Sequence, residues 1–269
     1  MSPNAIAAAF RAACHAELQA LKPGNVHIHA AGHGMTIADF EASAAAAAPH
    51  IAEPGARVGT RILGAVAATQ SAVGQNTNLG IVLLAAPLAA AAERGAEAGL
   101  KSALQAVLAG LDREDAALCF KAIALANPGG LGDAAEHDVR EEPSVTLLEA
   151  MRAAASRDRV AYQYASGYAD IFDTGLPIAA SAADMPEAAA AIYWRFLTTI
   201  PDSHIARKYG LGRAESVRSL AQSVDAAARD SRSRASLLLD LDARLKAEGI
   251  NPGTSADLTV ASLFAHHLM

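Results

Sequence analysis

Residues 79–92 read LGIVLLAAPLAAAA, and this stretch decides the fold class of the chain. It is the longest uninterrupted apolar run, with 14 residues that include Gly80 and Pro87. A membrane-spanning helix needs about 20 apolar residues, so the run is too short to cross a bilayer. We therefore expect a buried helix at the centre of a soluble protein that does not associate with a membrane.

The composition on both sides of this run favours more helix. Alanine dominates, aromatic residues make up only 4% of the 269 residues, and alternating runs of Val, Ile and Thr are nearly absent. Alanine is the best helix former, and its small side chain lets helices approach closely. The chain has no fixed-period repeat and no linker rich in Pro, Gly and Ser. We expect one all-α domain over residues 1–269, a single-domain bundle of many helices with its active site at the loops that join helix ends.

Start and stop signals place the individual helices. They include Ser2 as an N-cap, Thr36 in a capping box and Asn78 before the apolar run. The expected helices cover approximately residues 3–21, 36–49, 58–74, 79–92, 112–126, 144–155, 157–173, 187–200, 213–229, 231–248 and 255–269.

Charge and cysteine content argue against several classes of protein. The chain has 22 basic and 28 acidic residues, a net charge of −6, whereas a dedicated nucleic-acid binder normally carries a basic excess. Cys14 and Cys119 lie far apart without a CxxC motif, which argues against a disulfide framework or a thiolate zinc site. The sequence does not open with a basic segment and a long apolar stretch, so no signal peptide is expected. These features indicate a reducing, cytoplasmic compartment and no nucleic-acid partner.

The chemistry is expected in the breaks between helices, because these segments carry polar residues that a short connector does not need. A connector needs Gly or Pro, but it does not need lysine, amides and hydroxyls beside them. The five breaks cover residues 22–27, 74–80, 127–132, 202–208 and 251–257.

The break at residues 74–80 precedes the apolar helix and should lie at one end of the core. Asn76, Thr77 and Asn78 lie next to the first backbone N–H groups of that helix, which have no intrahelical partner and carry partial positive charge. Such a helix end suits a phosphate group. A purely structural role is also open, in which Asn78 caps the helix while the other two side chains satisfy loop carbonyls.

Lys22 and Glu17 lie at the first break. Lys22 can neutralise a phosphate as a point charge, and Glu17, about one helical turn earlier, can act as a general base or a magnesium ligand. In the structural alternative, Lys22 is a solvated turn residue that makes an ordinary surface contact with Glu17. Asp257 also allows two roles, because the helix dipole alone favours a carboxylate at the start of the last helix.

Three histidines follow in a glycine-rich loop. His27, His29 and His33 form the pattern H-x-H-x3-H, and imidazoles at this spacing can bind zinc. No thiolate and no HExxH helix accompany them. His33, between two glycines, is better explained as a hydrogen-bond donor or an acid that faces a ligand.

Two further patterns carry less weight. Residues 130–135 match GxGxxA, but the dinucleotide-binding motif follows a strand, and a helix is expected before this segment. The acidic clusters at residues 133–138 and 170–173 could face a magnesium-bound polyphosphate or simply solvent. The sequence has no Walker-type phosphate loop and no GxSxG nucleophile elbow.

Taken in order along the chain, these segments resemble the triphosphoribosyl-dephospho-CoA synthase family. The matching pieces are Glu17 with Lys22-Pro23-Gly24, Gly32-His33-x-Met35, Phe40 with Ser43, Ala68-Thr69, Gly74-x-Asn76-Thr77-x-x-Gly80, and Pro252-Gly253-x-Ser255-Ala256-Asp257-Leu258. Each piece is weak alone, but the ordered set runs from residue 17 to residue 258 and is fairly specific.

The resemblance implies an all-α fold and an unusual pentosyl transfer. ATP is then a substrate that loses adenine, and its anomeric carbon is taken by a ribose hydroxyl of 3′-dephospho-CoA. The implied partners are this nucleotide and a ribose-bearing acceptor, with Mg²⁺ as the expected cofactor. Independently of the resemblance, alanine-rich helical surfaces often pair, so a homodimer is a possible assembly.

The same resemblance implies roles for individual residues. Lys22, Asn76 and Thr77 would hold the triphosphate. Glu17 and Asp257 would be the base or the magnesium ligands. The remaining implied site residues are His33 as the acid and Gly24, Asn25, Gly80 and Ser255 as binding residues.

The sequence also departs from the family. The citrate-lyase branch typically reads Asn-Thr-His-Lys-Gly where residues 76–80 read NTNLG, so a cation is missing. An aspartate that usually follows the first Pro-Gly is replaced around residues 25–27. The chain is more similar to the branch found in archaea and in methylotrophs with methanopterin-type C1 carriers. There the donor would be phosphoribosyl pyrophosphate and the acceptor a pterin-linked sugar.

Two other classes of function are open on the residues alone. A metal-dependent phosphohydrolase would use His27, His29 and His33. A non-catalytic nucleotide-binding helical protein would not need the loops to converge. Convergence of Lys22, Asn76 and Asp257 on one cavity is therefore what the enzyme assignment requires.

Overall fold

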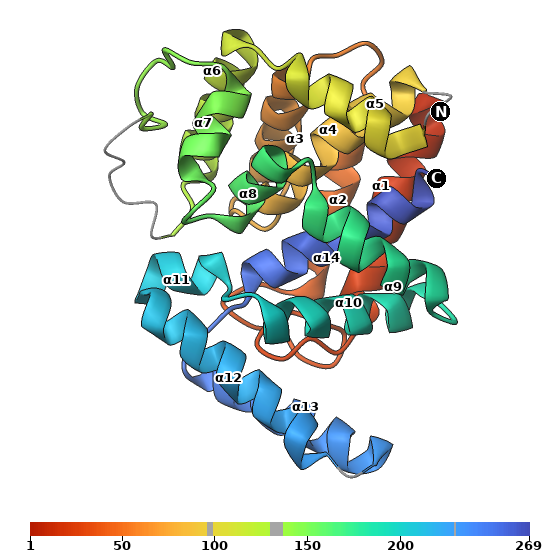
Figure 1. Cartoon of the computed structure of the whole chain (residues 1–269), viewed down its shortest axis with the longest axis vertical. Coiled ribbons are helices and arrows are strands. Elements are labelled where there is room, and N and C mark those ends of the chain that lie inside the picture. Colours follow the sequence, from red (N-terminus) through yellow and green to blue (C-terminus); the bar gives the residue numbers. More distant parts are fainter. Residues whose placement is uncertain (96–98, 130–136, 229) are drawn as a thin grey trace.

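The described part of the chain is built from helices and contains no β-strand. The computed structural model describes residues 1–95, 99–129, 137–228 and 230–269. The elements are α1 (Pro3–Gln19), α2 (Ile37–Ile51), α3 (Val58–Val73), α4 (Leu79–Arg94), α5 (Gly99–Ala109), α6 (Arg113–Ala126), α7 (Leu147–Ala154), α8 (Arg159–Ser166), the π-helical turn η1 (Ile171–Gly175), α9 (Leu176–Ser181), α10 (Met185–Thr199), α11 (Ser203–Tyr209), α12 (Leu211–Ala227), α13 (Ser231–Ala247) and α14 (Gly253–His267). The all-α prediction is confirmed (Figure 1).

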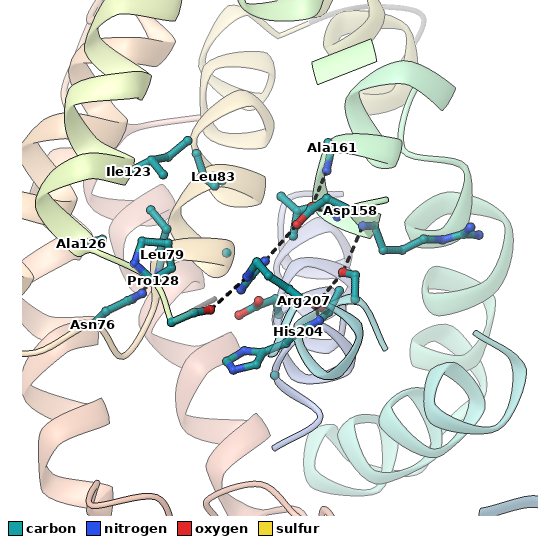
Figure 2. A pocket seen from close by; sticks show the side chains of 18 of the residues that line it. Asn76, Leu79, Leu83, Ile123, Ala126, Pro128, Asp158, Ala161, His204 and Arg207 are labelled. Carbon is teal, nitrogen blue, oxygen red and sulfur yellow. Dashed lines mark hydrogen bonds and ion pairs between the residues drawn. The ribbon is translucent and has the colours of Figure 1, made fainter. Parts of the chain in front are cut away.

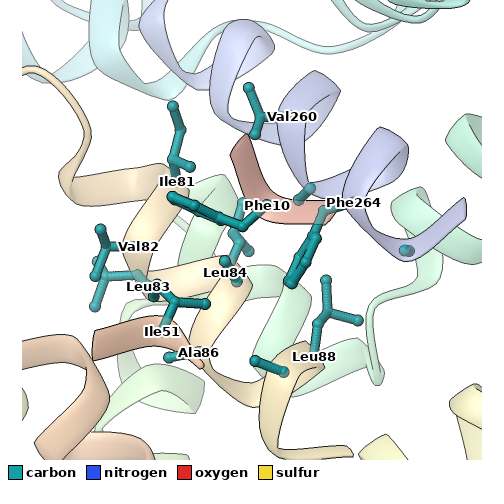
Figure 3. Packing of buried hydrophobic residues seen from close by; sticks show 14 of the residues in the cluster. Phe10, Ile51, Ile81, Val82, Leu83, Leu84, Ala86, Leu88, Val260 and Phe264 are labelled. Carbon is teal, nitrogen blue, oxygen red and sulfur yellow. The ribbon is translucent and has the colours of Figure 1, made fainter. Parts of the chain in front are cut away.

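The apolar helix α4 lies in the larger hydrophobic core, as residues 79–92 predict. Nearly all of its side chains are buried, and it contacts α1, α2, α3, α5, α8 and α14. Figure 3 shows Phe10 of α1 and Phe264 of α14 in this cluster, and their ring centroids lie 5.7 Å apart in an edge-to-face arrangement. This contact joins the first and last helices of the chain over α4.

Pro87 is tolerated inside α4 because a neighbouring segment satisfies the carbonyl that it leaves free. Proline has no N–H, so the carbonyl of Leu83, four residues earlier, lacks its helical partner. The Tyr164 hydroxyl of α8 donates to this carbonyl at 2.6 Å, and Tyr168 donates to the carbonyl of Leu84 at 3.2 Å. These two bonds fix the α8 segment against the central helix.

Several predicted helix ends are confirmed, and one predicted helix is interrupted. Thr36 opens a capping box, and Gly74 ends α3 with φ of 69°. The helix expected over residues 157–173 is wrong, because Gly167 and Tyr168 adopt φ of 67° and 65° and end α8. The chain then turns so that η1 packs on α14, where a Cβ on Gly175 would lie 2.0 Å from the Ser262 hydroxyl. α2 also continues through its proline to Ile51 instead of ending near residue 49.

Three helices of the structure are missing from the expected set. α5, α9 and α11 contain 11, 6 and 7 residues. α11 occupies the break at residues 202–208, which we expected to be a loop. Its N-cap is Asp202, whose carboxylate accepts hydrogen bonds from the first turn, so this break is a short helix that faces the cleft described next.

α12 and α13 form a hairpin that extends away from the remaining helices (Figure 1). Its base holds the glycine-rich loop, residues 22–35. Asp242 of α13 accepts a hydrogen bond from the Gly24 backbone N–H at 2.8 Å, and Lys246 donates to the Ala30 carbonyl at 3.1 Å. The hairpin therefore positions the loop that carries Asn25 and His33.

Among the described helices, none is both long and apolar enough to span a membrane by itself. α4 and α5 meet that criterion only when taken together, and they are bent by 113°.

Candidate active site

A cleft of about 1200 Å³ is lined by most of the site residues that were predicted from the sequence (Figure 2). It lies where ends of α4, α6, α8, α11 and α14 meet the glycine-rich loop. The predicted site residues that line it are Glu17, Asn25, His33, Asn76, Thr77, Gly80 and Asp257. Lys22, Gly24 and Ser255 are buried and do not line it. Loops far apart in the sequence thus share one cavity, although Lys22 does not reach it.

The segment before α4 leaves part of the helix end open to a ligand. Asn76 caps this helix, because its Oδ1 accepts from the Leu79 N–H at 3.1 Å. The expectation that Asn78 is the side-chain cap is wrong, since Asn78 turns inward and donates to Thr69 at 3.1 Å. No described residue accepts from the N–H groups of Gly80 and Ile81. This end of α4 therefore keeps free donors beside the cleft, the arrangement that suits an anion.

Asp257 places its carboxyl group directly against Gly80. A Cβ on Gly80 would lie 2.1 Å from Oδ2 of Asp257, so only glycine leaves room for this carboxyl group. The group makes no hydrogen bond or ion pair with any described residue. Burial raises the pKa of Asp257 well above its ordinary value, and the nearby carboxylates of Asp202 and Glu17 raise it further, while Arg207 opposes them. An unpaired carboxyl group of this kind in a cleft is a candidate functional group.

Glu17 and Lys22 form a buried ion pair, and the expected surface contact between them is wrong. Lys22 has no solvent exposure and also donates to Asn25 Oδ1 at 3.1 Å. Asn25 in turn donates to Asn251 at 2.8 Å. Burial raises the pKa of Glu17 and lowers the pKa of Lys22. Lys22 is therefore buried beneath the cleft surface, where it binds the side chains of Glu17 and Asn25, which line the cleft.

His33 lies in the cleft in a left-handed backbone conformation, with φ of 58°. Its Nε2 is 2.7 Å from the carbonyl oxygen of Gly24. Because a carbonyl only accepts, Nε2 carries the hydrogen of this bond, and Nδ1 is left for a ligand. Gly24 also has positive φ, 85°, and a Cβ there would lie 2.9 Å from Pro252, so this glycine shapes the wall.

The histidine pattern does not form a zinc site in the described chain. His27 is fully buried, 3.3 Å from Asp242 and 3.2 Å from Lys246, whereas His29 is exposed. No group of three His, Cys, Asp or Glu side chains in residues 1–95, 99–129, 137–228 and 230–269 could hold a metal ion.

The acidic and glycine-rich patterns noted in the sequence cover residues 130–138. Residues 130–136 lie outside the described residues, and His137 and Asp138 line the cleft.

Ser255 joins two helices that face the cleft. Its backbone N–H and its hydroxyl donate to Oδ2 of Asp202 at 2.8 and 2.9 Å. The other oxygen of Asp202 accepts from the N–H groups of His204 and Ile205 at 2.9 and 3.2 Å. Asp202 therefore holds the N-termini of α11 and α14 together, and Ser255 acts through this contact and not at the cleft surface.

The cleft also contains cations outside the set of predicted site residues. Arg157, Arg207 and Lys208 line it. Arg207 is fixed by Asp158 at 3.1 Å and by the carbonyl of Gly129 at 3.2 Å (Figure 2). The only sequence signal was the basic pair at positions 207 and 208 in a break between helices. These side chains supply the positive charge that Lys22 does not bring to the cavity.

The part of the cleft formed by α4, α6 and α7 is apolar. Leu83, Phe120, Ile123 and Met151 line it, and Figure 2 shows Leu83 and Ile123 facing this region. The cleft thus combines a polar part, at the ends of α4, α11 and α14, with an apolar part. This arrangement is typical of a site for an organic ligand that has both charged and uncharged portions.

Comparisons with known proteins assign the chain to a family. A family model for ATP:dephospho-CoA triphosphoribosyl transferase (CitG) matches residues 3–269. The chain is also similar to a crystal structure from Archaeoglobus fulgidus that carries the provisional name triphosphoribosyl-dephospho-CoA synthase, with a TM-score of 0.69 and 26% identity over 84% of this chain and 96% of that chain. No curated protein matches the chain. The chain therefore belongs to the ATP:dephospho-CoA triphosphoribosyl transferase family of transferases.

Proposed function

We propose that this chain transfers the 5-triphosphoribosyl group of ATP to a ribose hydroxyl of 3′-dephospho-CoA and releases adenine. The observation that carries the proposal is the shared cleft, which is lined by Asn76, Thr77 and Asp257 of the family's motifs and also by Arg207 and Lys208. A polyphosphate needs several donors and positive charges in one place, and this cavity offers both. The family match over residues 3–269 supports the same reaction.

The donor's phosphates are proposed to lie between α4 and α11. The free N–H groups at the start of α4 and the dipole of that helix favour negative charge. The Asn76 Oδ1 accepts from the Leu79 N–H, and its amide nitrogen, which has no acceptor among the described residues, is left to donate to a ligand. Arg207 and Lys208 of α11 line the same cleft. Thr77 also lines the cleft, and its hydroxyl donates a hydrogen bond to Ser43 at 2.6 Å. We therefore propose that Thr77 shapes the pocket.

Displacement at the anomeric carbon passes through an oxocarbenium-like state, as in glycoside chemistry. Adenine leaves poorly unless it is protonated, and we assign this proton to His33. Its Nε2 is committed to the Gly24 carbonyl, so a protonated ring would present Nδ1–H to the leaving group. The apolar part of the cleft is proposed to hold uncharged portions of the substrates.

Magnesium is proposed to enter with the donor's phosphates. Mg²⁺ prefers oxygen ligands and is usually held by one or two carboxylates together with substrate phosphates and water. Glu17 and Asp257 fit this role, because both line the cleft and Asp257 has no protein partner in the described chain. When bound, the ion would neutralise phosphate charge beside these carboxylates.

Excess EDTA is expected to stop turnover, and added Mg²⁺ is expected to restore it. Asp257→Asn should raise the Mg²⁺ concentration that gives half of the maximal rate, whereas Asp240→Asn, at an exposed carboxylate of α13, should not. The measurement is the rate of product formation against free Mg²⁺. Full turnover in excess EDTA would contradict the magnesium proposal.

A second donor is supported by one observation. Asn78 and Leu79, which stand where the citrate-lyase branch has His-Lys, are both buried, so this loop brings no cation to the donor. Phosphoribosyl pyrophosphate carries its leaving group as pyrophosphate and does not require adenine to be protonated. Its acceptor in this alternative is a pterin-linked sugar.

The two donors are separated by one assay. The protein is incubated with dephospho-CoA and either ATP or phosphoribosyl pyrophosphate, and the products are read by mass spectrometry. Free adenine together with a triphosphoribosyl adduct is the expected result. An adduct with pyrophosphate release from the second donor would support the alternative. If neither donor yields an adduct, and a pterin-linked sugar also remains unmodified, the proposed function is wrong.

A further inference from the structure

His204 lies in the cleft with both ring nitrogens free of protein partners. In the described chain neither Nδ1 nor Nε2 makes a hydrogen bond or an ion pair, whereas its backbone N–H donates to Asp202 at 2.9 Å and to Thr254 at 3.1 Å. The ring packs on Gly253, where a Cβ would lie 2.5 Å from Nδ1. Figure 2 shows this side chain in the cleft close to Arg207. The backbone is thus fixed, and the imidazole is left for a ligand.

The Asp202 carboxylate contacts the backbone N–H of His204, whereas the side chains that lower the pKa of its ring by charge repulsion are basic. Arg207 and Lys208 follow His204 on α11, and His33 faces it from the glycine-rich loop. Burial, followed by these three groups, lowers the pKa of His204 to about 4. The ring is therefore neutral near pH 7, which is the form that accepts a proton. Glu17, by contrast, is held by Lys22, and His33 has committed one nitrogen to a carbonyl.

We propose that His204 is the general base that takes the proton of the acceptor hydroxyl. This inference rests on the proposed function and names a catalytic residue for it. As the hydroxyl oxygen bonds to the anomeric carbon, its O–H bond breaks and the proton passes to the free imidazole nitrogen. The bond from the anomeric carbon to adenine breaks with its electron pair on adenine, which takes a proton from His33. Water returns the proton from His204 to His33, so the cycle neither consumes nor releases one.

Donor binding should strengthen this base. The phosphates would lie beside Arg207 and Lys208, and their negative charge would offset the charge repulsion that, after burial, lowers the pKa of His204. The pKa should then rise toward the ordinary value of 6.5. His204 would become an effective base only after the donor is in place.

His204→Gln is expected to lower kcat by about 10²–10⁴-fold, the usual contribution of general acid–base catalysis. The KM for the donor should change little. His29→Gln is the matched control, because His29 is an exposed histidine of the glycine-rich loop that does not line the cleft. Circular dichroism and thermal unfolding show whether both variants fold. An unchanged kcat in folded His204→Gln would overturn the inference, whatever the donor.

A titration tests the charge coupling without turnover. Histidine ring signals of the wild-type protein are followed by NMR against pH, with and without inorganic tripolyphosphate. One resonance with a pKa near 4 should be absent in His204→Gln and should move to higher pH when tripolyphosphate is added. A resonance that does not move would refute the coupling. Absence of transfer with every donor and acceptor would refute the proposed function instead, and the two failures are thus distinguishable.

The same group makes stability depend on pH. The pKa of His204 in the folded protein, about 4, lies below the ordinary value of 6.5, so the unfolded chain takes up the proton first. Stability is therefore lost as the pH falls from about 6.5 to about 4. His204→Gln should lose less stability than the wild type over this interval, measured by denaturant unfolding at each pH.

Discussion

Gly80→Ala is expected to lower kcat by about a hundredfold or more while the protein remains folded. A Cβ at this position would lie 2.1 Å from Oδ2 and 2.5 Å from Cγ of Asp257, so the carboxyl group has to leave its place. A displacement of about 1 Å in a catalytic constellation can cost 10²-fold in rate. The backbone itself should tolerate the change, because Gly80 lies in the first turn of α4 and alanine is a better helix former than glycine.

A matched glycine separates this steric effect from a general effect of adding a methyl group to a helix. Gly212, in the first turn of α12, has no atom within 4 Å of a built Cβ, so Gly212→Ala should leave kcat and stability almost unchanged. The double variant Gly80→Ala/Asp257→Ala removes the clash but also the carboxyl group. It should recover any stability lost in Gly80→Ala without recovering activity. Full activity in Gly80→Ala would show that the position of Asp257 does not matter to the reaction.

Most of the fold could be predicted because its signals are local. Thr36, Asp112 and Gly74 mark helix ends through contacts with residues at most four positions away. The interruption after α8 also has a local signal, because Gly167 ends that helix in a left-handed conformation, although the helix expected over residues 157–173 runs through it. The close approach of Gly175 to Ser262 in α14 could not be predicted in this way, because these residues are distant in the sequence.

The candidate site shows the same division between local and distant contacts. Asn76, Thr77 and Asp257 could be found because polar residues beside helix breaks are unusual in an alanine-rich chain. The orientation of Arg207 could not, since it depends on Asp158 of another segment. Asn76 also replaces Asn78 as the cap, because Thr69 of α3 draws the Asn78 side chain inward. These are contacts between elements, which spacing within one break does not encode.

The burial of Lys22 is the largest departure from the sequence expectation. Lysine is almost never fully buried unless it is paired, and a lysine before Pro-Gly is typical of a solvated turn. In the structure it pairs with Glu17 and also binds Asn25. Lys22 could bind phosphate directly, or it could support the cleft from beneath its surface. These two roles predict different results when Lys22 is replaced.

Lys22→Met is expected to destabilise the protein by about 3–5 kcal/mol, the usual cost of removing one partner of a buried ion pair. Lys121→Met, at an exposed lysine of α6, is the control and should change the free energy of unfolding very little. Glu17→Gln/Lys22→Met, which leaves no unpaired charge, should regain most of the lost stability but not kcat. Denaturant unfolding measures the first quantity, and product formation measures the second.

The pH dependence of Lys22→Met identifies the cause of this loss. Without Lys22, burial raises the pKa of Glu17 with no cation to oppose it, so the folded state favours the protonated carboxyl group more than the unfolded chain does. The stability of the variant should therefore be highest below the ordinary glutamate pKa of 4.5 and fall as the pH rises above it. A direct phosphate contact predicts another pattern, in which stability is unchanged at every pH and calorimetry shows weaker ATP binding. Because Lys22 is closed off from the cleft, we expect calorimetry to show a larger loss of ATP affinity in Asn76→Ala than in folded Lys22→Met.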